Sequence, residues 1–250
     1  MRWYNAAMPT VANLGCGNKT HPDCLNIDFS IYARMKRNRV GRLVGPVVFN
    51  GTRLEQFQNL DDNVVVHDLR KGIPLDEHSA DLVYHSHVLE HVDRDAVPGF
   101  FAEIRRVLKP GGIHRIVVPD LERYAQEYLA SLEEGLRDSQ ARMLHDSRVS
   151  QMLLQMVRRE AHGTSTQRPL RRRVENLVLG DARKRGETHM WMWDRVNLPQ
   201  ALEEAGFHDV RIVDWQTSRF AGWNDMALDQ NAEGGEYKPE SMYVEALRLR

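Results

Sequence analysis

The chain has 250 residues, 42% of them hydrophobic and 28% charged, and a formal net charge of −1. This balance excludes a mostly disordered chain and argues against a wholly basic nucleic-acid-binding surface. No run of about 18 apolar residues is present, so we expect no membrane span. The first residues lack an apolar signal-peptide core, and Cys16 and Cys24 cannot form a disulfide framework. We therefore expect a cytoplasmic protein.

Strand-like and helix-like stretches alternate over the first 120 residues. Short apolar runs predict five strands, at residues 10–14, 25–29, 63–67, 81–84 and 113–118. Before the fifth strand, apolar residues recur at three- and four-residue spacing over 100–108, which predicts a helix. A strand, a helix and a strand in this order form a βαβ crossover, so the strands are predicted to be parallel and covered on both faces.

The pattern changes at residue 121. Apolar spacing predicts helices over 121–132 and in the region 143–157, and we interpret residues 121–188 as a helical insertion that covers the substrate. Its arginine-rich part is expected to be a solvated face, with contact to an anionic substrate or RNA as the alternative. A helix over 198–205, capped by Gly206, and strands at 210–215 and 242–247 then resume the sheet. Residues 1–120 and 189–250 are thus predicted to form one α/β domain.

A glycine turn follows the first predicted strand directly. Gly15 and Gly17 can adopt positive φ and have no Cβ, so a ligand can approach the backbone closely. Parallel strands bind ligands at their carboxyl ends, where Asp28 and Asp68 end the second and third strands. Asp28 can accept hydrogen bonds from both hydroxyls of a ribose, and Asp68 can accept from an exocyclic amine while Leu69 packs on a base.

A nicotinamide dinucleotide is the main competing ligand for such a turn. Its fingerprint is G-x-G-x-x-G/A, but Thr20 occupies the third glycine position here and Pro22 follows closely. No clear helix opens on Gly17, so a pyrophosphate would lack a helix N-terminus to bind. The turn therefore suits a ligand without a pyrophosphate.

These residues resemble the class I S-adenosylmethionine-dependent methyltransferases, nearest to methyltransferase type 11. The matching motifs stand in the family's order over residues 10–120: N-L-G-C-G-N at 13–18, L-N-I-D at 25–28, H-D-L at 67–69, A-D-L-V-Y-H-S-H-V-L-E-H-V at 80–92 and E-I-R-R-V-L-K-P-G-G at 103–112. The resemblance implies a doubly wound, Rossmann-like α/β fold. Its seven-stranded sheet would have an antiparallel last strand and a helical insertion between strands five and six. The family's usual first helix is missing or reduced here, because little chain separates Gly17 from the second strand.

The resemblance also implies a cofactor, S-adenosyl-L-methionine, and roles for individual residues. Gly15 and Gly17 would line its methionine moiety, Asp28 would hold its ribose, and Asp68 with Leu69 would frame its adenine. Residues at the end of the fourth strand would face the methyl group and the acceptor. The full set of cofactor-binding residues is then Asn13, Gly15, Cys16, Gly17, Asp28, Asp68, Leu69, His85 and Ser86.

Methyl transfer to a hydroxyl or a protonated amine is helped by a general base within hydrogen-bond reach of the departing proton. The candidates after the fourth strand are His85, His87, Glu90 and His91, and we select His87 and His91. Three histidines also suggest a metal site, but the resemblance offers an explanation without a metal, and we expect none. The aromatic and methionine residues of 189–193 are predicted either to wall a pocket or to fill the core.

The sequence thus predicts a methyltransferase that acts on a small-molecule or saccharide-linked acceptor, by O- or N-methylation. Nucleic acid is not an expected partner, because the signatures of DNA adenine and cytosine methyltransferases are missing from the sequence. The alternatives are a catalytically inactive module that binds S-adenosylmethionine or a nucleotide, and an oxidoreductase with a nucleotide cofactor. Binding of S-adenosylhomocysteine or of NAD would distinguish them.

Overall fold

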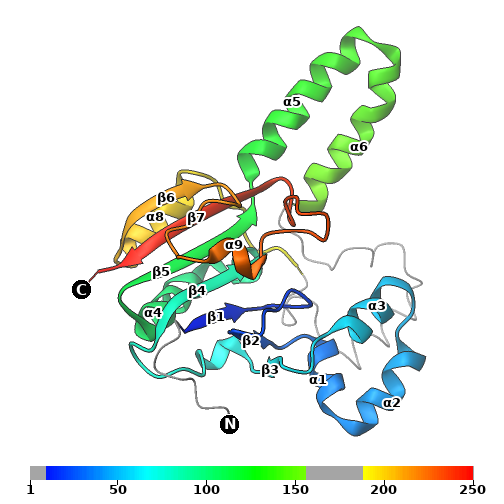
Figure 1. Cartoon of the computed structure of the whole chain (residues 1–250). Helices are drawn as coiled ribbons and strands as arrows, with labels where there is room; N and C mark the ends of the chain where they lie inside the picture. Colours follow the sequence, from blue (N-terminus) through cyan, green and yellow to red (C-terminus); the bar gives the residue numbers. More distant parts are fainter. Residues whose placement is uncertain (1–9, 156–187, 250) are drawn as a thin grey trace.

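The structure is a computed structural model that describes residues 10–155 and 188–249. Its centre is a seven-stranded sheet in the order β3-β2-β1-β4-β5-β7-β6 (Figure 1). The strands are β1 (Val11–Leu14), β2 (Cys24–Asp28), β3 (Val65–Val66), β4 (Ala80–Ser86), β5 (Leu108–Pro119), β6 (Phe207–Val213) and β7 (Ser241–Arg248). Strands β1 to β5 pair in parallel, and β7 runs antiparallel to both β5 and β6. The predicted doubly wound α/β fold with an antiparallel last strand is confirmed.

Each face of the sheet is covered differently. Helices α4 (Val97–Val107) and α8 (Asn197–Glu204) lie on one face, and a long segment with the short helix α9 (Trp223–Met226) lies on the other (Figure 1). Phe101 and Ile104 of α4 and Leu202 of α8 are buried in the larger core against the first face. Trp223 and Leu228 pack on the second face. This two-sided cover explains why the inner strands are mostly apolar and why their few polar side chains are buried with partners.

The region after β5 begins with two long helices, α5 (Leu121–Arg137) and α6 (Ser139–Gln155), which pack against each other as a hairpin and project from the sheet (Figure 1). Asp120 caps α5 by accepting a hydrogen bond from the backbone N–H of Glu122. Residues 156–187, which include the arginine-rich stretch, lie outside the described residues. The proposed limits of the insertion therefore stay a prediction. No described helix is long and apolar enough to cross a membrane.

Three helices between β2 and β3 were not predicted: α1 (Ile31–Arg37), α2 (Arg39–Val48) and α3 (Gly51–Asn59). Ser30 and Asn38 cap the first two by accepting hydrogen bonds from backbone N–H groups two or three residues on. Strand β3, which follows them at the sheet edge, has two residues instead of the predicted five. The expectation of a missing first helix is confirmed, because the chain between Gly17 and β2 consists of turns.

A buried guanidinium fixes the long segment between β6 and β7 to the sheet. Arg115 of β5 has no solvent exposure, and it contacts the carboxylates of Asp229 and Glu245 at 2.8 Å each. Its other N–H groups donate to the backbone oxygens of Asp214, Trp215 and Thr217. With its donors all used and two anions beside it, this charge is tolerated in the core, whereas removal of one partner would leave an uncompensated buried charge.

Two histidines pair in the core on the opposite face. Nε2 of His85 on β4 lies 3.0 Å from Nε2 of His114 on β5, and neither ring is exposed to solvent. Phe101 and Phe207 pack against the His114 ring. Burial disfavours the charged imidazolium, so it lowers the pKa of His85 to about 4 and the pKa of His114 well below its usual value.

This pair predicts that the protein loses stability in mild acid. Because both folded-state pKa values are depressed, the unfolded chain binds more protons below the usual histidine pKa of about 6.5, and stability falls as pH drops below it. His85 alone is expected to cost about 2 kcal/mol between pH 7 and pH 5. The measurement is urea unfolding at both pH values. The double variant His85→Leu/His114→Phe should show a smaller loss than the wild type, and equal losses would contradict the assignment.

Candidate functional site

The glycine turn after β1 lies in direct contact with the end of β4. Gly15 has φ +62°, and a Cβ built on it would come within 2.4 Å of Cγ2 of Val88. The backbone of Gly17 is also left-handed, with φ +51°, but a Cβ there would meet no atom of the described residues within 4 Å. Glycine is therefore required at 15 for space and at both positions for conformation, and the surface above Gly17 is open.

Asp28, at the end of β2, lies beside this turn. Its side chain is nearly buried, and it accepts hydrogen bonds from the backbone N–H groups of Gly17 at 3.0 Å and of Ser30 at 2.6 Å. Each bond uses one oxygen, and a carboxylate has about four acceptor positions. Asp28 is thus held rigidly by main chain and retains capacity to accept from a diol.

Asn13 and Cys16, both predicted to bind the cofactor, are buried in the structure. The amide N–H groups of Asn13 donate to the backbone oxygen of Lys19 and to Oδ1 of Asn26, so this side chain secures the loop that follows the turn. Burial, and next the charge of Asp28, raise the pKa of the Cys16 thiol far above its usual value, which makes it unreactive. Their contact with a cofactor stays a prediction.

Asp68 and Leu69 stand at the end of β3, as predicted. Asp68 caps the short 3₁₀ helix η1 (Leu69–Lys71) and forms a two-point ion pair with Arg70, whose NH2 lies 2.7 Å from Oδ2. The hydrogen bonds from Arg70 lower the pKa of Asp68. The Arg70 side chain is well exposed, so this pair stabilises the fold little. Asp68 would need to share its carboxylate with Arg70 to accept from an adenine amine.

The prediction that His85 faces the site is wrong. Side chains alternate along a strand, and the His85 ring is directed into the core, where it pairs with His114. Ser86, the next residue, is half-buried and projects from the opposite face of β4. Residues after the strand end are therefore the ones that can reach a ligand above the glycine turn.

His87 lies at this strand end, between a hydroxyl and a carboxylate. Its Nε2 is 2.9 Å from Oγ of Ser241, the first residue of β7, and its Nδ1 is 3.2 Å from Oε1 of Glu90. The backbone of His87 has φ +53°, a strained conformation for this residue, and its side chain remains 24% exposed. The ring is thus hydrogen-bonded at Nε2, lies beside a carboxylate at Nδ1, and is still accessible.

Glu90 was a candidate base that the sequence analysis did not select, and the structure places it beside His87. It belongs to the 3₁₀ helix η2 (Leu89–His91) and has no solvent exposure. Burial on its own would raise its pKa, but the His87 ring and the charges of His91 and His189 outweigh burial and lower the pKa to about 2. Glu90 is therefore an ionised carboxylate inside the protein, next to a histidine.

His91, the second predicted catalytic residue, lies on the other side of Glu90. Its Nδ1 donates to the backbone oxygen of Thr188 at 3.1 Å, and its ring meets that of His189 edge-on. Ligand atoms of Glu90, His91 and His189 lie within 4.8 Å of one another. One carboxylate and two imidazoles form a donor set that zinc uses in other proteins, so the expectation of no metal stays a prediction.

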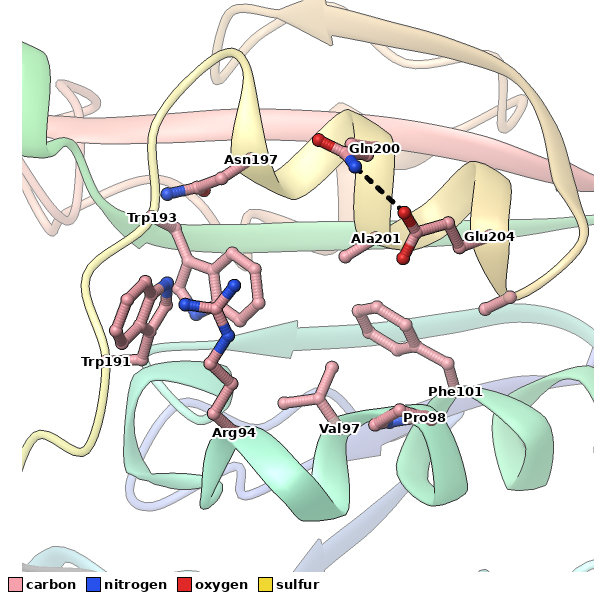
Figure 2. Close-up of a pocket in the computed structure, with 11 residues that line it drawn as sticks. Arg94, Val97, Pro98, Phe101, Trp191, Trp193, Asn197, Gln200, Ala201 and Glu204 are labelled. Carbon is pink, nitrogen blue, oxygen red and sulfur yellow. Dashed lines mark hydrogen bonds between the residues drawn. The ribbon is translucent and has the colours of Figure 1, made fainter.

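A pocket opens next to this cluster, between α4 and α8. Its volume is about 220 Å³, and Figure 2 shows Trp191 and Trp193 at one end and Gln200 and Glu204 at the other. The guanidinium of Arg94 stacks on Trp191, with its Cζ 3.9 Å from the ring centroid. Both tryptophans line this pocket, and Trp193 is also buried in the larger core, so both predicted roles of 189–193 are present, while a place near the cofactor stays a prediction. The same segment borders the cluster, because the N–H of Met190 donates to the backbone oxygen of Glu90.

Residues 23–116, less than half of the chain, match a family model described as a methyltransferase domain. The matched segment begins just before β2 and ends within β5, so it contains Asp28, Asp68, His87 and Glu90, while the glycine turn precedes it. Over these residues the chain is similar to that family. The resemblance to class I S-adenosylmethionine-dependent methyltransferases is therefore confirmed. No curated protein matches the chain in sequence.

Solved structures show weaker similarity. A possible exported protein from Bordetella parapertussis is 15% identical with a TM-score of 0.41, over 97% of this chain and 62% of that one. A SAM-dependent methyltransferase from Archaeoglobus fulgidus is 13% identical with a TM-score of 0.40, over 97% and 87%. A Haemonchus contortus phosphoethanolamine N-methyltransferase 2, in complex with S-adenosyl-L-methionine, is 14% identical with a TM-score of 0.38, over 98% and 50%. This chain thus spans less than two thirds of two of these relatives, and the fold assignment rests on its own strand order.

The contact between Gly15 and Val88 predicts unequal effects of two alanine substitutions. Gly15→Ala should destabilise the protein by about 2–4 kcal/mol, because a methyl group meets Val88 and φ is positive, whereas Gly17→Ala should cost about 1 kcal/mol for φ alone. Urea unfolding of both variants measures the difference. Adding Val88→Ala should recover part of the Gly15→Ala loss but none of the Gly17→Ala loss. A lack of coupling in that cycle would disprove the contact.

Proposed function

We propose that this protein transfers a methyl group from S-adenosyl-L-methionine to a hydroxyl or amine of a small-molecule or saccharide-linked acceptor. The observation that carries the proposal is the His87 ring, held between Ser241 and the buried carboxylate of Glu90, one residue from the contact with the glycine turn. The match to a methyltransferase domain over residues 23–116 supports it.

The residues beside the turn suit this cofactor. Asp28 has acceptor capacity for two ribose hydroxyls, and the left-handed backbone at Gly17 leaves open space for a ligand to lie against main chain. When bound, the cofactor would supply a methyl group that is already activated by a positively charged sulfur. The protein then has to align the acceptor and exclude water, and orientation of this kind can lower a barrier by about 7–11 kcal/mol.

His87 is the residue best placed to take the acceptor's proton. The ionised carboxylate of Glu90 can only accept a hydrogen bond, so it favours the tautomer with the proton on Nδ1 and leaves the lone pair on Nε2. Nε2 then accepts from the hydroxyl of Ser241. An acceptor hydroxyl that replaces Ser241 at Nε2 would be positioned for deprotonation.

The proposed step balances without a further reactant. The oxygen or nitrogen of the acceptor forms a bond to the methyl carbon, the carbon–sulfur bond breaks with its electron pair remaining on sulfur, and the acceptor proton moves to Nε2 of His87. The imidazolium that results is stabilised by the adjacent carboxylate of Glu90. Glu90 is in this scheme a positioning residue, and His91, bound to the backbone of Thr188, holds the neighbouring segment.

Two alternatives lead to different results in a binding experiment. An oxidoreductase would bind NAD, but turns rather than a helix follow Gly17, and a pyrophosphate would find no helix N-terminus there. An inactive binding module would bind the cofactor without turnover. The pairing of a strained, accessible His87 with a buried carboxylate favours an active enzyme over such a module.

The first test is ligand binding. S-adenosylhomocysteine should raise the melting temperature of the protein by mass action, and NAD should not. Asp28→Asn should weaken binding of S-adenosylhomocysteine by about tenfold or more in isothermal titration, since a hydrogen bond to a charged group contributes about 1.5–3 kcal/mol. Asp76→Asn, at an exposed aspartate that precedes β4 at the opposite end of the strands, is the control. Stabilisation by NAD alone would overturn the proposed function.

The second test concerns the base. Transfer of a radiolabelled methyl group to a panel of mono- and oligosaccharides and small alcohols identifies an acceptor. With that acceptor, His87→Asn should lower kcat by about 10²–10⁴-fold while S-adenosylhomocysteine binds as before. Glu90→Gln should lower kcat less and change its pH profile. If His87→Asn retained full activity at every pH, another group would have to be the base.

A further inference from the structure

Helix α2 is packed with its small residues inward and its large aliphatic residues outward. Gly41 and Gly45 are buried, and a Cβ on Gly45 would come within 2.5 Å of the Phe57 ring of α3. The opposite face carries the largest exposed apolar side chains of this region: Val40, Leu43, Val44, Val47 and Val48. An ordinary surface helix has the reverse arrangement, so this face, which we call the α2 apolar face, is unusual.

The α2 apolar face lies on the outside of the molecule. Helix α2 packs against α1 and α3, and Figure 1 shows the three helices as a group at one end of the sheet, with α2 turned away from it. Leu43 and Val47 are 79% and 86% exposed. Nothing among the described residues covers these side chains.

Basic side chains are frequent on the helices around this face. Residues 29–54 contain six Lys or Arg and no Asp or Glu. Of these, Arg34, Arg37, Arg39 and Arg42 are exposed on α1 and α2. Arg42 lies 3.5 Å from Asp62, and Arg34 lies over the exposed ring of Phe29. The three-helix group therefore combines an aliphatic face with a local positive charge in a chain whose net charge is −1.

We propose that the α2 apolar face docks onto an anionic lipid surface. An amphipathic helix that lies in the membrane interface buries its aliphatic side chains at the level of the acyl chains while its Lys and Arg side chains contact lipid headgroups. Both signals are present within α1 and α2, and stable binding without a covalent anchor generally requires two. The docked helix would lie along the surface without crossing it.

The charge distribution disfavours the other occupants. A second copy of the chain would bring two basic groups together. Residues 156–187 contain nine Lys or Arg and four Asp or Glu, so that segment has the same sign of charge. A nucleic acid would pair with the arginines but would leave five aliphatic side chains in water. An anionic bilayer satisfies both parts of the surface.

The test is vesicle flotation with the full-length protein. Vesicles of phosphatidylcholine with about one third phosphatidylglycerol should carry the protein at low salt, and vesicles of phosphatidylcholine alone should carry much less. Leu43→Ser/Val47→Ser should lower binding by about tenfold or more, because the inserted apolar area is lost. Arg39→Glu should weaken binding to the anionic vesicles only.

Matched controls come from the α5–α6 hairpin. Leu136 and Leu144 are 75% and 69% exposed, so Leu136→Ser/Leu144→Ser removes a similar exposed area elsewhere. Arg137→Glu, on exposed α5, matches the charge reversal. Both controls should bind vesicles as the wild type does. Thermal unfolding checks that all variants fold, and S-adenosylhomocysteine binding, which the proposal does not require, should be unchanged in each.

Four results would overturn the proposal. The first is a wild-type protein that floats with neither vesicle. The second is equal vesicle binding by Leu43→Ser/Val47→Ser and the wild type. The third is a stable dimer, seen by light scattering, that the same variant converts to a monomer in the absence of vesicle binding; this would assign the face to a second copy. Retention on an oligonucleotide without flotation would equally contradict a lipid partner.

Discussion

The close approach of Gly15 to Val88 determines where everything else in the site can lie. The two residues belong to the turn after β1 and to the end of β4, which are neighbouring strands in the sheet. There is no room between them even for the methyl group of an alanine at position 15. The two strand ends therefore form one continuous surface, with Asp28 on one side and His87 on the other. The candidate cofactor-binding residue and the candidate base are thus adjacent because β1 and β4 pair as neighbours and the Val88 side chain packs on the bare main chain of Gly15.

The buried Arg115 has a comparable role on the other face of the sheet. Its contacts hold residues 214–217 and Asp229 against β5 and β7, and Asp229 in turn accepts from the hydroxyl of Tyr84 at 2.6 Å. Strand β7 begins at Ser241, the partner of His87, directly after this segment. A guanidinium in the core therefore fixes the starting point of the strand that supplies one contact of the base. Its desolvation cost is offset by two carboxylates and three backbone oxygens.

Much of the fold could be predicted, since strand periodicity, the glycine turn and the βαβ crossover all depend on local sequence. The positions of Asp28 and His87 followed from the rule that ligands bind at the carboxyl ends of parallel strands. His85 was misplaced because its direction depends on alternation within β4, which ends two residues later than predicted. Glu90 is a local neighbour, three residues from His87, but Ser241 lies 154 residues away in the chain, and only tertiary packing brings it to the His87 ring. Helices α1 and α2 escaped prediction because their buried residues are alanine and glycine, so the aliphatic residues do not mark a core-facing stripe. Helix α3 buries the single residue Phe57, which is too little to show a helical period.

The way α1 is attached has a mechanical consequence. Asp28 accepts from the N–H of Ser30, and the hydroxyl of Ser30 in turn accepts from the N–H of Ala33, so two hydrogen bonds connect the carboxylate to the first turn of the helix. Phe29 is the sole residue between them. A rigid tilt of the three-helix group must therefore either bend the chain at Phe29 or stretch one of these bonds. A displacement of the three-helix group is in this way passed on to the Asp28 carboxylate through about one turn of α1.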